Sequence, residues 1–321
     1  MRRRKFISIL GAAALPIAAR AQPPQKSHRI ALVHSGIPAD KLTEAAGPFW
    51  VRRFYEELRG FGYAEGANLI VDRFSAEGRS DRFAAVAEAV VKSNPDVIVS
   101  NFNALIKLLM KATTTLPIVG LTGEPLSDGL VSNLAHPGGN LTGASISAGV
   151  AMGAKRLQYL KEAAPTAAKI GYVYGSRAEE KRSGVTLWAK ILPEVNEPQL
   201  RSAFAEMTEE RIQAALISET GSFLANRALI VELAAQHRLP MIYPYRDFVE
   251  QGGLMAYAPD LGELAKRMAS DVHQIFNGTK PGDIPFFLPT KFDLVINLKT
   301  VKSLGLTIPP TLLDFASEVI E

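Results

Sequence analysis

Cysteine is absent from the 321-residue sequence. The protein therefore has no disulfide, no thiolate metal site and no thiol nucleophile. It also has no cysteine that could carry a lipid after an export leader, so we expect the mature chain to be soluble and unanchored. Histidine is scarce as well. The five histidines show neither H-x-x-x-H nor H-E-x-x-H spacing, so the sequence gives no indication of a metal site.

Catalytic motifs are also missing. The chain has no G-x-S-x-G nucleophile elbow and no G-x-x-x-x-G-K-[ST] phosphate loop. His34 and Ser35 are adjacent and suggest a nucleophile with its base. Neighbouring residues on a strand point to opposite faces, however, so a strand would keep their side chains apart. We therefore predict that the protein is not an enzyme and uses no cofactor.

Blocks of like charge are lacking after the first five residues. The formal net charge is +4, but residues 1–21 hold five cations and no acid, so the remaining chain carries −1. A nearly neutral body argues against nucleic acid or an anionic membrane as a partner. The apolar run near the amino terminus is about half of the ~20 residues that a spanning helix needs, and Pro16 interrupts it.

The first 21 residues have the pattern of an export signal. The charged start MRRRK is followed by an apolar stretch to Ala18 and by the small-x-small site Ala19-Arg20-Ala21. The letters RRKFI resemble a twin-arginine signal, although general secretory export stays open. We predict a cleavable signal peptide at residues 1–21 and a periplasmic mature protein that begins near Gln22.

The body alternates β-branched runs with helical patterns, which predicts a parallel sheet with right-handed crossovers. We expect first-half strands at 29–35, 69–74, 96–100 and 116–121, with helices at 50–60, 81–93 and 103–113. The Gly/Pro/Asn-rich segment 136–143 indicates a first crossing between two lobes. The alternation then resumes, with strands at 169–174, 215–218, 239–243 and 253–257 and helices at 151–162, 209–215, 223–237 and 261–276.

About 300 mature residues exceed one comfortable core and suggest two domains. We assign residues 28–142 and 261–321 to the first lobe and residues 143–260 to the second. The lobe that receives the C-terminal tail stays open. The predicted fold class is α/β, with two Rossmann-like lobes that have parallel sheets and are joined by a hinge, and we expect a monomer.

Polar and aromatic residues follow the predicted strands of both halves. Ligands of open α/β sheets bind beyond the carboxyl ends of the strands, so we expect these residues to face one cleft. Hydroxyls and amides suit a carboxylate, Glu side chains suit an ammonium group and Tyr rings suit an apolar part. The same residue types also serve as caps and turn formers. The predicted ligand-binding residues are Ser35, Asn101, Asn103, Thr122, Glu124, Ser176, Glu219, Thr220, Tyr243 and Tyr257.

Several ordered motifs give the chain a family resemblance. They are KATTTLPIV (111–119), GLVSNL (129–134), HPGGNLTG (136–143), KRL (155–157), GGLM (252–255) and PTKFDLVINLKT (289–300). With these motifs the chain resembles the bacterial ABC-transporter substrate-binding protein family related to the tryptophan-binding protein TrpX. The resemblance implies a type I periplasmic-binding-protein architecture, an amino-acid-like or small carboxylate solute, and ABC permease subunits as partners.

Three turns depart from the family pattern. Residues 101–103 (NFN) are bulkier than the usual small turn, residues 174–177 (YGSR) replace turns rich in Asn and Pro, and residues 219–221 (ETG) replace a common Gly-Asp-Pro. Because these turns lie at predicted cleft positions, the ligand of the family does not transfer automatically. Two alternatives to a transport receptor remain. One is an exported enzyme that uses Glu124 or Glu219 as a general base. The other is a solute sensor without its own transporter.

Overall fold

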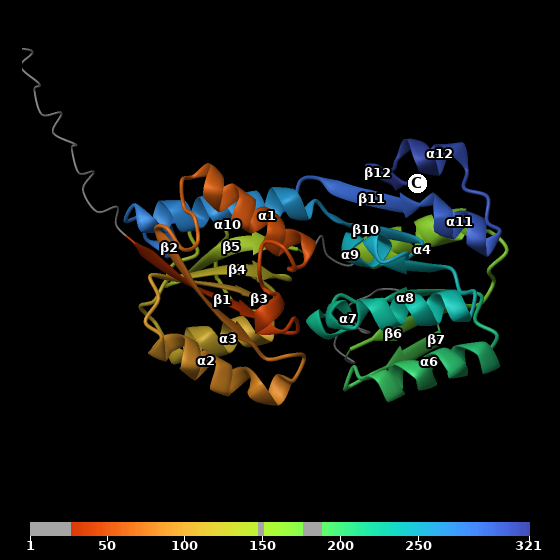
Figure 1. Ribbon diagram of the computed structural model, residues 1–321, viewed down its shortest axis with the longest axis horizontal. Helices are drawn as coiled ribbons and strands as arrows, with labels where there is room; N and C mark the ends of the chain where they lie inside the picture. Colours follow the sequence, from red (N-terminus) through yellow and green to blue (C-terminus); the bar gives the residue numbers. More distant parts are fainter. Residues whose placement is uncertain (1–26, 147–150, 176–187) are drawn as a thin grey trace, which may run out of the picture.

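The structure is a computed structural model that describes residues 27–146, 151–175 and 188–321. The predicted signal peptide and Ser176 lie outside the described residues. Two lobes, each built around its own sheet, lie side by side (Figure 1). The predicted α/β class with parallel sheets in two lobes is confirmed.

The first lobe contains a five-stranded sheet in the order β2-β1-β3-β4-β5, with every neighbouring pair parallel. Apart from the edge strand β2, its strands are almost completely buried on both faces, as expected for a parallel sheet covered by helices. They are β1 (His28–His34), β2 (Leu69–Ser75), β3 (Val97–Asn101), β4 (Ile118–Thr122) and β5 (Leu141–Ser145).

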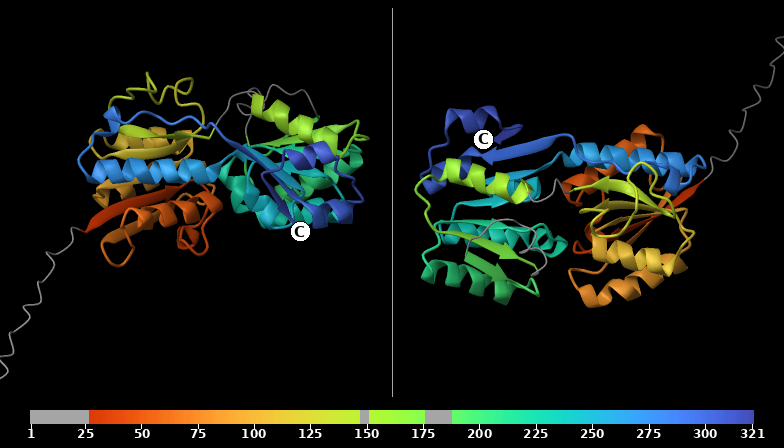
Figure 2. Two further views of the ribbon diagram at one scale, coloured as in Figure 1. Left: turned by 90° about the horizontal axis from the view of Figure 1, so that it is seen from above. Right: turned by 180° about the vertical axis from the view of Figure 1, so that it is seen from behind.

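Helices cover both faces of this sheet, two on each (Figures 1 and 2). Alternating residues of β1 enter two different hydrophobic clusters, one on each face of the sheet, and each cluster includes one pair of helices. Ile30 and Leu32 pack with α1 (Phe49–Gly60) and α10 (Leu261–Phe276). Ala31 and Val33 pack with the second pair, α2 (Phe83–Lys92) and α3 (Asn103–Ala112). Short 3-10 turns lie at η1 (Ala39–Lys41), η2 (Ser80–Arg82) and η3 (Pro281–Asp283).

The second lobe contains a seven-stranded sheet in the order β12-β11-β10-β9-β8-β6-β7. All of its neighbouring pairs are parallel except β10 with β11. Its strands are β6 (Ile170–Tyr174), β7 (Trp188–Ile191), β8 (Ala214–Ile217), β9 (Met241–Tyr243), β10 (Met255–Pro259), β11 (Phe292–Asn297) and β12 (Glu318–Ile320).

Helices also cover both faces of the second sheet. One face carries α4 (Ala151–Ala163), α11 (Leu298–Leu304) and α12 (Pro310–Asp314). The other face carries α6 (Glu197–Glu209), α8 (Arg227–Gln236) and α9 (Arg246–Glu250). The short helix α7 (Gly221–Ala225) follows β8 and lies toward the first lobe (Figure 1). In the part of the chain that the structure describes, no helix is both long and apolar enough to span a bilayer.

Two of the predicted lobe boundaries need correction. The segment 136–143 is not itself a crossing, because residues from Leu141 onward form β5 of the first sheet. The tail 261–321 was assigned whole to the first lobe, but only its first part, α10 and the segment up to Phe287, packs there. Strand β11 instead pairs antiparallel with β10, and β12 pairs with β11. The apolar residues of β11 would fit either sheet, and the pairing of its backbone with β10 determines which sheet it joins.

Candidate functional site

The tips of β1 and β3 are tied together in the first lobe. The Asn101 Oδ1 atom accepts a hydrogen bond from the Ser35 backbone N–H at 2.9 Å. The Asn101 Nδ2 atom donates to Ser35 Oγ at 3.3 Å. Parallel strands bring their carboxyl ends to one edge, so these residues meet although 66 positions separate them. The structure thus brings together two of the predicted site residues.

Asn103 links the tips of β3 and β4. Its Oδ1 atom accepts from the Gly123 N–H at 2.7 Å, and its Nδ2 atom donates to Asp128. The preceding residue, Phe102, has φ of +73°, which is uncommon for an aromatic residue, and its ring packs edge-on against Phe83. Such a backbone costs of order 1–3 kcal/mol and persists only when its surroundings hold it. Here the bonds of the flanking asparagines hold the turn.

Thr122 and Glu124 follow β4 with different exposure. Thr122 is fully buried, and its hydroxyl lies 3.4 Å from the Ala144 carbonyl oxygen, to which it donates. Glu124 accepts a hydrogen bond from the Ser127 hydroxyl at 2.8 Å and is partly exposed. Asn101, Asn103 and Thr122 thus all have structural bonds, as the cap-and-turn alternative anticipated.

The two lobes touch where α7 begins. Thr220 caps this helix by accepting from the Phe223 N–H at 3.1 Å, which places Gly221 at the surface of the second lobe. A Cβ atom on Gly221 would lie 2.4 Å from Ser35 Oγ, and one on Gly36 would lie 2.3 Å from the Gly221 carbonyl oxygen. We name this close approach of Ser35 and Gly36 to Gly221 the jaw contact.

A hydrogen bond lies beside the jaw contact. The Ser222 hydroxyl donates to the Gly78 carbonyl oxygen at 3.3 Å, and Gly78 follows β2 of the first lobe. Gly78 has φ of +81°, a conformation that glycine adopts without strain. The tips of β1 and β2 therefore both meet the start of α7.

Glu219 is half of an ion pair at the tip of β8. The Arg156 Nη1 atom lies 2.5 Å from Glu219 Oε1, and the Arg156 Nε atom donates to the Tyr257 carbonyl oxygen at 2.7 Å. The Arg156 side chain is 2% exposed and that of Glu219 is 33% exposed. One arginine of α4 therefore joins the turn after β8 to the middle of β10.

The two predicted tyrosines lie on opposite faces of the second sheet. Tyr243 is fully buried and stacks on Phe248, with 4.8 Å between ring centroids, and burial raises its pKa. Tyr257 is partly exposed and packs edge-on against Tyr159 at 5.0 Å. A single solute cannot contact both rings across the sheet, so the structure separates these two predicted residues.

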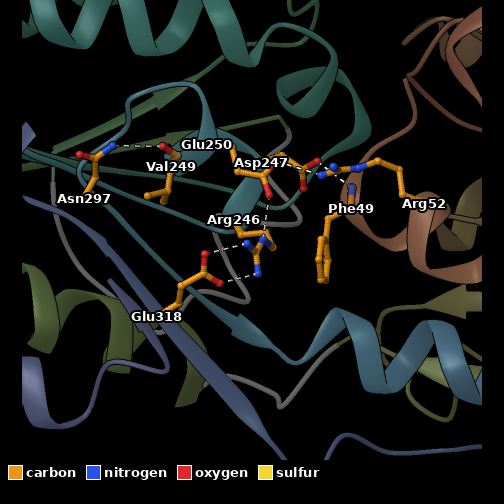
Figure 3. Close-up of polar contacts among 8 residues, drawn as sticks. All are labelled: Phe49, Arg52, Arg246, Asp247, Val249, Glu250, Asn297 and Glu318. Carbon is orange, nitrogen blue, oxygen red and sulfur yellow. Dashed lines mark hydrogen bonds and ion pairs between the residues drawn. The ribbon is translucent and has the colours of Figure 1, made fainter. Parts of the chain in front are cut away.

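A second interlobe contact joins α1 to α9, and we name it the hinge-side contact (Figure 3). The Asp247 Oδ1 atom accepts from the Phe49 N–H at 2.9 Å, and Arg52 forms an ion pair with Glu250 at 3.0 Å. The Arg246 guanidinium stacks on the Phe49 ring at 4.3 Å. Phe49 and Arg246 line a small hollow with Pro259 and Leu261, where the chain passes between the lobes.

Asp247 supplies a cap that α1 lacks in its own sequence. The N-cap residue of α1 is Pro48, which makes no side-chain capping bond. We therefore expect Asp247→Ala to speed hydrogen exchange of the Phe49 amide roughly five- to tenfold, because such a cap contributes about 1 kcal/mol. The measurement is amide exchange by NMR. The Val51 amide bonds to the Pro48 carbonyl at 2.9 Å and should stay unchanged. Equal exchange at Phe49 in both proteins would contradict the cap.

His34 does not act as a base for Ser35. Its Nδ1 atom accepts from the Gly36 and Ile37 backbone N–H groups at 3.0 and 2.9 Å. Complete burial lowers the pKa of His34 to about 3, so the ring is neutral at physiological pH. The ring holds the loop after β1 through these two bonds. It lies nearly parallel to the Trp50 ring, with 6.0 Å between the ring centroids.

Several polar residues of these sites were not predicted from the sequence: Arg156, and Arg52, Arg246, Asp247 and Glu250 of the hinge-side contact. All of them lie on helices, whereas the predicted residues were sought only at strand ends. A usable signal exists for α1 alone: the segment Gly47-Pro48 offers no capping side chain, which implies a donor from elsewhere. Within residues 27–146, 151–175 and 188–321, no group of three or more His, Cys, Asp or Glu side chains could hold a metal ion.

The chemistry at the facing strand tips is that of reversible binding. Hydroxyl, amide and backbone N–H groups from the first lobe meet the start of α7, and Glu219 of the Arg156–Glu219 pair in the second lobe lies two residues before Gly221. Such groups form hydrogen bonds and ion pairs with a small polar molecule. The described side chains show no nucleophile hydrogen-bonded to an activating base at the jaw contact.

Comparisons with known proteins agree with this geometry. A Tyrosine-binding protein of Clostridioides difficile (strain R20291) is 22% identical over 263 residues, which are 79% of this chain and 75% of that protein. A conserved domain protein of Vibrio cholerae has a TM-score of 0.76 at 25% identity, over 92% of this chain and 100% of that one. An ABC domain of Streptococcus pneumoniae in complex with L-Trp has a TM-score of 0.77 at 23% identity, with the same coverage.

The family comparison covers most of the chain. Residues 50–320 match the family described as ABC transporter substrate binding protein. The match extends from the second residue of α1 to the end of β12. It includes most of both lobes but begins after β1, the jaw residues Ser35 and Gly36, and Phe49. It confirms the resemblance seen in the sequence motifs, and the chain belongs to the ABC transporter substrate-binding protein family.

Proposed function

We propose that this protein is a periplasmic receptor that captures an amino acid or a related small carboxylate between its lobes. The single observation that carries the proposal is the jaw contact, where strand-end loops of the two lobes meet at Ser35, Gly36 and Gly221. A solute that contacts both lobes stabilises the closed arrangement, because it gains contacts there that an open form lacks. The closed protein then docks on the permease subunits of an ABC importer.

Two kinds of support favour an amino-acid-like solute. The facing groups offer both hydrogen-bond donors and carboxylates, which suits a molecule with one charge of each sign. Two related proteins are named for tyrosine binding and for a complex with L-Trp. The proposed binding residues are Ser35, Asn101, Asn103, Glu124 and Glu219, with Tyr257 beside them.

Isothermal titration tests the proposal directly. Protein stripped of solute under mild denaturation and refolded is titrated with the twenty L-amino acids and with small carboxylates. We expect saturable one-to-one binding of at least one amino acid, with a rise in melting temperature at saturating solute. Correctly refolded protein that binds none of them would exclude an amino-acid receptor.

The same samples separate the receptor from the exported-enzyme alternative. After prolonged incubation with the protein, chromatography should recover the bound solute unchanged. A new product, lost when Glu124 or Glu219 is replaced by Gln, would show catalysis. The absence of a functional base at His34 supports the receptor.

A further inference from the structure

Arg156 is a charged residue in an almost fully buried position. Lys and Arg are rarely buried without partners, because removing a charge from water is costly. Arg156 has two partners, the Tyr257 carbonyl oxygen in the middle of β10 at 2.7 Å and Glu219 Oε1 just after β8 at 2.5 Å. Strand β9 lies between β8 and β10 in the sheet. The guanidinium therefore fixes the turn after β8 relative to β10.

The two side chains of this ion pair differ in their exposure to solvent. The Glu219 side chain is 33% exposed, whereas that of Arg156 is 2% exposed. A solute in the cleft can therefore reach the carboxylate but not the guanidinium. Glu219 also lies only two residues before Gly221, which touches the first lobe at the jaw contact.

Fixing a carboxylate has a consequence for selectivity. A free glutamate side chain loses rotamer entropy when it binds, whereas one already held by a buried arginine loses less. A preorganised acceptor favours a ligand that carries a matching donor and rejects an analogue without it.

We propose that Arg156 is a positioning residue that holds Glu219 as the acceptor for the ammonium group of the solute. The inference rests on the proposed function and adds the solute class: the protein selects molecules with a protonated amine. Arg156 itself does not contact the solute.

The test compares matched solutes with and without the amine. L-Tyrosine and L-tryptophan are titrated against 3-(4-hydroxyphenyl)propanoate and indole-3-propanoate, which keep the ring and the carboxylate. We expect the wild-type protein to prefer the amino acid at least about hundredfold, because the analogue leaves the carboxylate without its partner. Glu219→Gln should reduce that preference about tenfold or more, mainly by weakening the binding of the amino acid.

Arg156 variants separate positioning from a merely structural role. Arg156→Lys keeps the charge but cannot bridge both partners as a guanidinium does, so we expect a preference between those of wild type and Glu219→Gln. The readout is the ratio of two affinities, which general destabilisation does not move selectively. Glu232→Gln, on the exposed side of α8, is the control and should keep the wild-type ratio. Circular dichroism verifies that each variant folds.

Three negative outcomes can be distinguished. If the wild-type protein binds an amino acid and Glu219→Gln keeps the full preference over the analogue, the inference is wrong and the proposed function stands. If the wild-type protein binds neither the two amino acids nor their analogues, while other solutes of the amino-acid and carboxylate set bind without preferring an amine, the inference is also overturned. If nothing in the set binds, the proposed function itself fails.

Discussion

Gly36→Ala should hold the lobes apart and weaken solute binding at least about tenfold. A Cβ atom at this position would lie 2.3 Å from the carbonyl oxygen and 2.4 Å from the carbonyl carbon of Gly221. Both atoms belong to the backbone, which cannot rotate aside as a side chain can. Closure would then lose the nearby interlobe hydrogen bond and the solute contacts of one lobe. Such bonds contribute about 1 kcal/mol each, so losing two reaches a tenfold effect.

Small-angle X-ray scattering of the solute-saturated proteins provides the measurement. It should give a larger radius of gyration for Gly36→Ala than for the wild-type protein, because the solute closes only the wild type completely. Gly60→Ala is the matched control: a Cβ atom there meets nothing within 4 Å, and the residue ends α1 far from the jaw contact. Identical scattering of Gly36→Ala and wild type, with unchanged affinity, would show that the jaw contact is not required for closure.

Asp271→Asn should stabilise the protein at alkaline pH. It should also remove most of the fall in unfolding free energy that the wild type shows as pH rises. Asp271 is completely buried on α10, and neither of its carboxylate oxygens accepts a hydrogen bond from the described residues. Arg267 Nε lies 2.9 Å from Oδ1 without hydrogen-bond geometry. Burial raises the pKa of Asp271 from 3.8 to about 7, and Arg267 opposes that rise only in part. Ionising this group in the folded state costs about 4 kcal/mol.

The sign of the pH effect follows from the raised pKa. Between pH 4 and pH 7 the folded protein keeps the proton on Asp271, whereas the unfolded chain has lost it. The contribution of this group to stability is therefore complete below about pH 4. It declines as pH rises and is fully lost above about pH 7. Urea unfolding at pH 4.5, 6 and 8 should show this decline in wild type and a much flatter profile in Asp271→Asn.

A neutral amide in the same position still lacks partners, which costs about 1–3 kcal/mol. The net gain of Asp271→Asn at pH 8 should therefore be about 1–3 kcal/mol, and at pH 4.5 the variant should be no more stable than wild type. Asp283→Asn changes an exposed carboxylate in the same part of the chain and should alter neither profile. A wild-type profile retained in Asp271→Asn would mean that another group titrates.

Periodicity and turn chemistry predicted much of the first lobe. The expected helices at 50–60 and 103–113 differ from the observed helices by one residue at one end or the other, because their apolar stripes match the two faces of one sheet. The passage from strand to helix near residue 260 was also predicted, from the amphipathic pattern of 261–276. In the structure Asp260 caps that helix by accepting from the Gly262 and Glu263 N–H groups.

Local signals failed where a distant partner decides the structure. The segment 136–143 is rich in turn residues, but Leu141 and Thr142 extend along β4 because that edge of the sheet is free to pair. The strand 292–297 is apolar enough for either lobe, and its pairing with β10 decides. The Arg156–Glu219 pair and the Asp247 cap join residues 63 and 198 positions apart, which no short-range pattern encodes.

The division of the first lobe has a consequence during synthesis. The nascent chain completes all five strands of that sheet by Ser145, but α10, which covers one of its faces together with α1, begins only at Leu261. Until then, apolar side chains such as Leu32 and Val119 lack half of their cover. The ribosome must therefore release more than four-fifths of the polypeptide before the earliest lobe can bury its core, and a chaperone has that interval in which to bind it.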